Sequence, residues 1–108
     1  MSLTVVWVDP GQAKLFHFSE DRMQREILPA PPNDSNFSSL FSQIIQKLSL
    51  AKKVLLLGPG NTKEKLLELL NQSHAPLAKK VVGCEDSDHP SDHQIAAYAT
   101  KYLQKPVA

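Results

Sequence analysis

The sequence predicts an α/β fold: one mixed sheet of five strands with helices on both faces. Three observations predict it. The aliphatic run Val54–Leu57 is typical of a strand buried on both faces, as central parallel strands are. Amphipathic helical patterns lie on both sides of this run in the sequence. Short strand-like segments joined by turn residues occupy the first quarter of the chain.

Residues 4–8, 13–18 and 23–28 are predicted to form an antiparallel meander. The first segment is rich in β-branched and aromatic residues, and the second alternates polar with apolar residues. Between them, Asp9-Pro10-Gly11-Gln12 has the composition of a tight turn. The third segment alternates only loosely, which indicates an edge strand with one exposed side.

The first predicted helix covers residues 37–48. A proline-rich linker, Pro29–Asn36, precedes it, and Ser35 or Asn36 is the predicted N-cap. The apolar residues fall on one helical stripe: Phe37, Leu40, Phe41, Ile44, Ile45 and Leu48.

The central strand, 54–57, stops at Gly58-Pro59-Gly60, and a second helix begins directly after that turn. Asn61 and Glu64 are predicted to form a capping box at its start. Residues 73–76 end this helix, and 80–84 form another short buried strand. A loop over 85–90 leads to the last helix, which a second capping box opens with Ser91 and Gln94.

This order of elements predicts the topology. A meander followed by two right-handed crossovers gives the sheet order 3-2-1-4-5, with strands numbered along the chain. That is the ribonuclease H-like arrangement. A chain of 108 residues is long enough for one core but not for two, so residues 1–108 are expected to form a single domain.

Composition limits the classes of partner. A formal net charge of +1 creates no strong field toward nucleic acid or an anionic membrane. RNA contact would therefore need a local patch, for which Lys52-Lys53 and Lys79-Lys80 are the paired candidates. The single Cys84 cannot form an internal disulfide, and neither a secretion signal nor a membrane-spanning run is present. We expect a cytoplasmic protein without membrane attachment.

The turn after the central strand is a candidate anion site, because it delivers the free N–H groups of a helix start. Its spacing is not that of a Walker A loop, and Pro59 lacks the N–H that such a loop needs. The alternative is a tight turn plus a helix cap. The candidate ligand-binding residues are Gly58, Gly60, Asn61, Thr62 and Lys63.

The segment 85–93 is rich in carboxylates and imidazoles, which are ligands of divalent metals. Asp9, at the end of the first strand, is predicted to lie at the same sheet edge. The candidate metal ligands are Asp9, Asp88, His89, Asp92 and His93. The alternatives are a solvated loop with acids at a helix start and, for Asp9, a turn role. The carboxylates of a two-metal nuclease are missing, so no catalytic residue and no cofactor is predicted.

Several segments together resemble a bacterial family of small proteins, described as translational-machinery-type or host-attachment-like. This family is similar to the middle domain of the eukaryotic and archaeal class-1 peptide release factor and to its ribosome-rescue relative. The resemblance covers nearly the whole chain. The segments that carry it are Val6–Asp9 with Ala13–Phe18, Leu56–Gly60 with Lys63, and Val81–Gly83 followed by Asp88–Asp92 and Gln94.

The resemblance implies what this chain lacks as well as what it shares. In the release factor, a Gly-Gly-Gln tripeptide lies on the loop between the meander and the first long helix. Here that loop is Pro29–Asn36, which contains neither Gly nor Gln. Peptide release is therefore not expected. The rescue relative also lacks the tripeptide and binds ribosomes, so the resemblance implies association with translation.

Two hypotheses follow. The first is a non-catalytic, translation-associated binding module with a ribosome, tRNA or other RNA, or a translation factor as partner. A homodimer is also a candidate state. The alternative is a metal-dependent hydrolase whose site lies at the carboxyl edge of the strands 4–8, 54–57 and 80–84, where open α/β sheets bind ligands.

Overall fold

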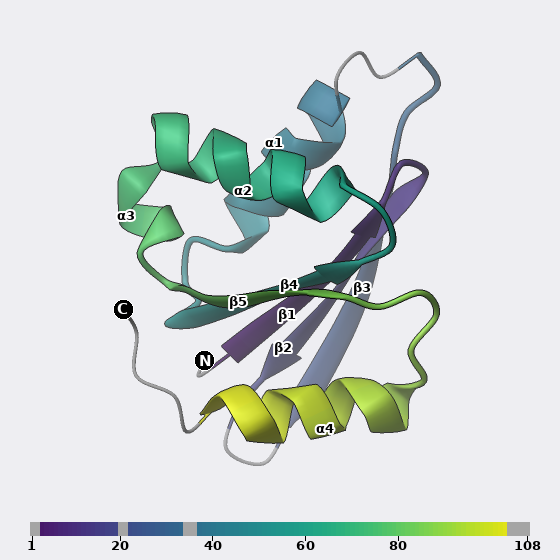
Figure 1. Ribbon diagram of the computed structural model, residues 1–108, viewed down its shortest axis with the longest axis vertical. Helices are drawn as coiled ribbons and strands as arrows, with labels where there is room; N and C mark the ends of the chain where they lie inside the picture. Colours follow the sequence, from purple (N-terminus) through teal and green to yellow (C-terminus); the bar gives the residue numbers. More distant parts are fainter. Residues whose placement is uncertain (1–2, 20–21, 34–36, 104–108) are drawn as a thin grey trace.

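The computed structural model describes residues 3–19, 22–33 and 37–103, and Figure 1 shows a sheet between two layers of helices. The sheet order is β3-β2-β1-β4-β5, which confirms the predicted fold and topology. The meander pairs antiparallel, and β4 lies parallel to both β1 and β5. The strands are β1 (Leu3–Asp9), β2 (Gln12–Phe18), β3 (Met23–Pro29), β4 (Lys53–Gly58) and β5 (Val81–Asp86).

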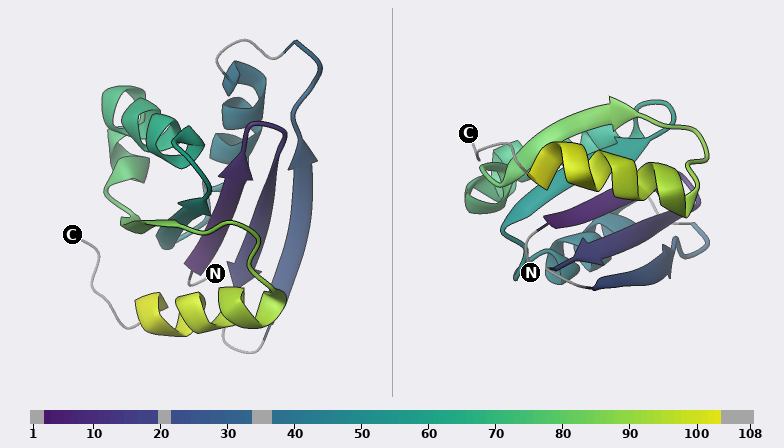
Figure 2. Two further views of the ribbon diagram at one scale, coloured as in Figure 1. Left: turned by 45° about the vertical axis from the view of Figure 1, so that its right-hand side comes forward. Right: turned by 90° about the horizontal axis from the view of Figure 1, so that it is seen from below.

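Helices cover both faces of the sheet. In Figures 1 and 2, α1, α2 and α3 lie on one face and α4 lies on the other. None of the described helices has the length and apolar character needed to cross a membrane. The helices are α1 (Ser38–Lys47), α2 (Thr62–Ser73), α3 (Ala75–Ala78) and α4 (Asp92–Leu103).

Each face of the sheet has its own core. Val6 and Leu56 alternate with Val5 and Leu55 along neighbouring strands, so each pair points to the opposite face. The first pair packs among the apolar stripes of α1 and α2, and the second packs against α4. Since all four side chains have no exposed surface, the aliphatic run indeed marks a strand buried on both sides.

Helix starts differ from the predictions in two places. Ser35 and Asn36 lie outside the described residues, and Phe37 stands at the N-cap of α1 in the left-handed conformation (φ 60°). Asn61 does occupy the N-cap of α2, but its side chain makes no capping bond. The predicted capping box is wrong there, because the Asn61 backbone (φ −112°, ψ 8°) does not have the extended conformation that is typical of a capping side chain.

The capping box of α4 is confirmed. The Ser91 backbone N–H donates to Gln94 Oε1 at 2.9 Å, and the Gln94 N–H donates to Ser91 Oγ at 3.2 Å. Two other elements differ from the prediction. The short α3 was missed; Pro76 in its first turn needs no N–H partner there. Strand β5 continues through Glu85 and Asp86, where the sequence pattern predicts a loop.

Candidate functional site

The carboxyl ends of the parallel strands meet at one edge of the sheet, as predicted. Gly58 is paired with Asp86, and the Ser87 N–H donates to the Gly58 carbonyl oxygen at 3.1 Å. The extra length of β5 has a simple cause: β4 runs on to Gly58 and offers ladder partners to the last two residues of β5.

Asp9 has a structural role at this edge. Its Oδ1 atom accepts the backbone N–H groups of Gly11 at 2.8 Å and Gln12 at 2.9 Å. This is the Asx-type turn that the sequence chemistry favours. The carboxylate oxygen of Asp9 is thereby committed to the hairpin between β1 and β2.

The turn from β4 to α2 holds a buried lysine. Lys63 is 2% exposed, and its ammonium group donates to the Gly60 carbonyl oxygen at 2.6 Å and to Asp86 Oδ1 at 2.5 Å. Burial alone would lower the pKa of Lys63, but the hydrogen bond and charge of Asp86 raise it above its ordinary value. The lysine therefore ties the turn to the end of β5 instead of facing solvent.

The rest of the candidate anion site is divided between surface and interior. Gly60 and Asn61 are exposed, whereas Thr62 is 3% exposed and Gly58 is buried against β1. A bound anion at the start of α2 would reach backbone N–H groups near Gly60 and Asn61. The Lys63 charge is already neutralised by Asp86, so the anion site stays a prediction.

Glu85 links β5 to α4. Tyr102 donates its hydroxyl hydrogen to Glu85 Oε2, and Lys101 Nζ lies 3.5 Å from the same oxygen. The hydrogen bond to Glu85, together with burial and the charge of Glu85, raises the pKa of Tyr102 to about 12. Gly83 makes room for this contact, because a Cβ there would lie 2.6 Å from the Tyr102 ring.

The acidic and histidine-rich loop after β5 is spread out. Asp88 Oδ1 lies 3.8 Å from His89 Nε2, while Asp92 at the start of α4 pairs instead with Arg25 of β3, at 3.2 Å. His93 lies exposed in the first turn of α4. The described residues contain no group of three or more His, Cys, Asp or Glu side chains that could hold a metal ion, so the metal site also stays a prediction.

Trp7 of β1 anchors this loop. The Trp7 indole N–H donates to the Ser87 carbonyl oxygen at 2.9 Å, and the His89 ring lies over the indole with 5.9 Å between centroids. Lys14 Nζ lies 5.4 Å from the centre of the Trp7 ring. Trp7 is 2% exposed, so its role is to hold the loop rather than to stack on a ligand.

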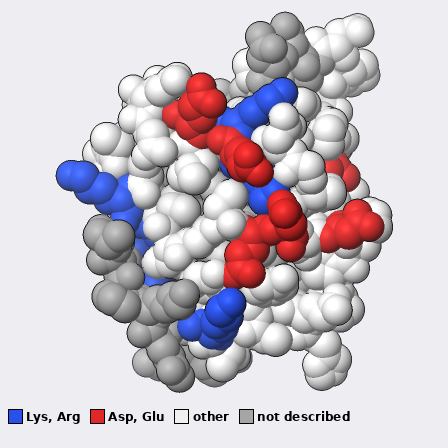
Figure 3. All heavy atoms as spheres, viewed as in Figure 1, with Lys and Arg blue, Asp and Glu red and all other residues white. Residues whose placement is uncertain are grey.

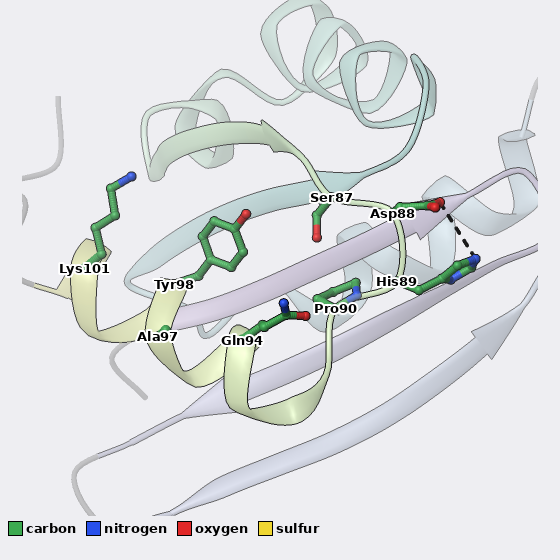
Figure 4. A pocket seen from close by; sticks show the side chains of 8 residues that line it. All are labelled: Ser87, Asp88, His89, Pro90, Gln94, Ala97, Tyr98 and Lys101. Atoms are coloured by element: carbon green, nitrogen blue, oxygen red, sulfur yellow. Dashed lines mark ion pairs between the residues drawn. The ribbon is translucent and has the colours of Figure 1, made fainter.

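Beside the loop lies a hollow of about 500 Å³ (Figure 4). Tyr98, Lys101 and Gln94 line it from one side of α4, and the loop closes it from the other side. The sequence patterns did not single out these three α4 residues as a site, although the spacing of residues 94, 98 and 101 places them on one face of a helix. The loop residues that line the hollow are Ser87, Asp88, His89 and Pro90.

The four lysines of the predicted basic patch lie next to the starts of two neighbouring strands, at the opposite end of the sheet, and their role as an RNA-binding patch stays a prediction. Lys53 begins β4, and Lys80 directly precedes β5; the Val54 N–H donates to the Lys80 carbonyl oxygen at 2.9 Å. Lys52 and Lys79 are exposed beside them. We call these four residues the lysine cluster. Lys53 also donates to the carbonyl oxygen of Leu103, the last described residue of α4, at 2.6 Å.

Acidic side chains occupy a different region. Figure 3 shows them over α2, β5 and the loop after β5, with basic side chains at the left margin near α3 and the start of β5. The ion pairs agree with this distribution, since Lys63 and Lys101 both contact acids of β5. On this face, basic side chains also lie beside the acidic ones, so the two signs of charge are interspersed there (Figure 3).

No protein-family model matches this chain, and no curated protein sequence does. Its fold is similar to solved structures. Pelota from Archaeoglobus fulgidus has a TM-score of 0.73 at 18% identity, over 94% of this chain and 31% of Pelota. The archaeal translation termination factor aRF1 has a TM-score of 0.67 at 17% identity, over 95% of this chain and 34% of aRF1.

A third similar structure is S. cerevisiae Dom34, a translation termination-like factor involved in RNA quality control pathways and interacting with Hbs1. Its TM-score is 0.59 at 13% identity, over 94% of this chain and 34% of Dom34. The chain thus spans about a third of the length of these proteins. The similarity is to release-factor-type domains; the bacterial grouping expected from the sequence stays a prediction.

Proposed function

We propose that this chain is a non-catalytic binding module that associates with the translation machinery. The observation that carries the proposal is the fold, which is shared over almost the whole chain with Pelota, aRF1 and Dom34. The loop 29–36 contains no Gly-Gly-Gln tripeptide, so binding rather than peptide release is the expected activity. We further propose that residues 1–108 form one release-factor-middle-domain-like unit in the cytoplasm.

The lysine cluster is the proposed RNA contact. The backbone bond between Val54 and Lys80 supports this proposal, because it brings the two lysine pairs to neighbouring strand starts although they lie far apart in the sequence. Lysine side chains bind phosphates as point charges, and they bring little sequence specificity. We therefore expect contact with the backbone of ribosomal RNA or tRNA, weakened strongly by salt.

A matched pair of double variants tests this contact. Lys52→Gln/Lys79→Gln removes two exposed charges from the lysine cluster, and Lys47→Gln/Lys65→Gln removes two exposed charges from α1 and α2. We expect the first variant to bind purified ribosomes and tRNA several-fold more weakly and with a shallower salt dependence. The second variant should bind as the unaltered chain does.

Equal loss in both variants would show that only total charge matters, and no loss in either would remove the lysine cluster from the interface. Circular dichroism of each variant checks that the fold is unchanged. If all three proteins fail to bind RNA yet still sediment with ribosomes, the partner is a translation factor or ribosomal protein instead. A homodimer is also proposed, and its interface is argued below on separate grounds.

A further inference from the structure

Strand β3 forms an open edge of the sheet. It pairs with β2 on one side, and no described strand lies on the other; Figure 2 shows this edge without any described element beyond it. The strand is seven residues long. Exposed edges of this length are ready to pair with another chain.

The backbone groups that face outward can be identified from the β2–β3 ladder. Bonds at its two ends join the Ser19 N–H to the Arg22 carbonyl oxygen and the Ala30 N–H to the Gly11 carbonyl oxygen. In an antiparallel ladder, bonded residues alternate with unbonded ones. The even-numbered residues 22–30 therefore bond to β2, and the backbone groups of Met23, Arg25 and Ile27 point to the open edge.

The side chains of these same residues share one face of the sheet. Met23 is 41% exposed and Ile27 is 55% exposed, the two large apolar side chains that the described part of the meander leaves open. Arg25 lies between them, and its guanidinium contacts both carboxylate oxygens of Asp92, at 3.2 and 3.3 Å. The charge of Arg25 is thus balanced within its own chain.

We propose that a second copy of this chain pairs with β3 across this edge, antiparallel and with a two-fold axis at Arg25. Every outward N–H and carbonyl group of Met23, Arg25 and Ile27 then gains a partner. Met23 lies opposite Ile27 of the second copy, so both exposed apolar side chains are covered. Gln24 lies opposite Glu26 of the second copy, where an amide can donate to a carboxylate.

Other two-fold registers are less favourable. An axis at Glu26 places Met23 opposite Pro29, which has no N–H to donate. An axis at Ile27 places Arg25 opposite Pro29, which has no N–H to donate. An axis at Gln24 leaves Ile27 without a partner in the described strand. The axis at Arg25 brings two arginines together, but each is paired with its own Asp92.

The edge contact is small. A strand pair of this length buries less than the roughly 1,600 Å² of a standard protein interface, so the dimer is expected to be weak. Covalent trapping is therefore the appropriate test. Directly opposite bonded residues have Cα atoms about 5.5 Å apart, within the range that a disulfide spans.

Single cysteines report the register, in a Cys84→Ala background that removes the natural thiol. Under mild oxidation, Arg25→Cys should form a disulfide dimer rapidly. Met23→Cys alone and Ile27→Cys alone should each dimerise slowly, because the same position in the two copies is separated by about 13 Å along the strands. A mixture of the two variants should dimerise rapidly, because Met23 of one copy lies opposite Ile27 of the other. Ser42→Cys, exposed on α1, measures random collision.

The result that would overturn the proposal is an Arg25→Cys rate no faster than the Ser42→Cys rate. Equal rates for all three strand positions would also overturn it, because they would indicate collision without a register. A second test needs no cross-link and leaves Arg25, the residue at the proposed two-fold axis, unchanged. Met23→Lys/Ile27→Lys should lose the dimer seen by sedimentation equilibrium, and an unchanged dimer would place the interface elsewhere. The outcome is independent of ribosome binding.

Discussion

At the scale of single residues, Gly58 is the most constrained position. Its φ is 150°, and a Cβ there would lie 2.2 Å from the Val8 carbonyl oxygen. Val8 belongs to β1, the central strand, and is fully buried, so the backbone cannot move away. Gly60 in the same turn also has positive φ (63°), but a Cβ added there would have no other atom within 4 Å.

The two glycines therefore give a matched comparison. Gly58→Ala should lower the free energy of unfolding by about 3 kcal/mol or more, because it adds a backbone clash to strain. Gly60→Ala should cost only about 1–2 kcal/mol, the cost of the left-handed conformation alone. Urea denaturation measures both. Equal losses would mean that the approach of Gly58 to β1 is not tight.

Tyr102 has the most strongly shifted hydroxyl. Its folded pKa of about 12 lies above the ordinary value of 10.0, so the folded state holds this proton more tightly than the unfolded state. The contribution to stability is full below pH 10 and falls as the pH rises toward 12. In a tyrosinate absorbance titration, Tyr102→Phe should remove the step near pH 12. A step near pH 12 that survives in this variant would contradict the assignment to Tyr102.

At the scale of elements, Lys63 joins the start of α2 to the end of β5. Its ammonium group is buried, whereas the side chain of its partner Asp86 is 86% exposed. A buried charge that loses its partner costs more than an exposed one that returns to water. Asp86→Asn should thus destabilise the fold by about 1–3 kcal/mol, and Lys63→Met by less. The reverse order in urea denaturation would contradict this account.

Glu26 of β3 contacts two other elements. The His17 ring on β2 donates to Glu26 Oε1 at 2.8 Å, and Lys47 of α1 lies 3.5 Å from Oε2. The hydrogen bond from His17, with the charge of Lys47, lowers the pKa of Glu26 below 4.5 although burial opposes the shift. This contribution is present above pH 4.5 and is lost as the pH falls through the folded pKa.

Glu26→Gln tests that contact. We expect a loss of roughly 0.5–1.5 kcal/mol in the free energy of unfolding at neutral pH. The difference from the unaltered chain should shrink in acid, where Glu26 is protonated in both states. A loss of the same size at all pH values would show that the carboxylate charge is not involved.

Most of the secondary structure, but not all of the candidate site, could be predicted from the sequence. Apolar runs, strand-type composition, polar–apolar alternation and helical stripes predicted the five strands of the sheet, three helices and their order. The predicted cap at Asn61 does not form because the Asn61 backbone is not in the extended conformation typical of a capping residue. The ends of β5 and the hollow beside Tyr98 depend on neighbouring elements, which local patterns do not encode.

At the scale of the whole molecule, the charge distribution matters more than the total. The formal net charge is only +1, yet the fold gathers the lysine cluster at the amino ends of β4 and β5. Acidic side chains lie over α2 and β5 instead (Figure 3). This separation could not be predicted from composition. It follows from the parallel pairing that brings Lys53 beside Lys80.

The most direct measurement is sedimentation of the tagged 108-residue chain from a cell lysate through sucrose gradients at low and high salt. We predict migration with ribosomal subunits at low salt and release at high salt, because phosphate contacts weaken steeply as counterions compete. Lys52→Gln/Lys79→Gln should shift the protein toward the top of the low-salt gradient. Migration at the top of both gradients for the unaltered chain would contradict association with the translation machinery.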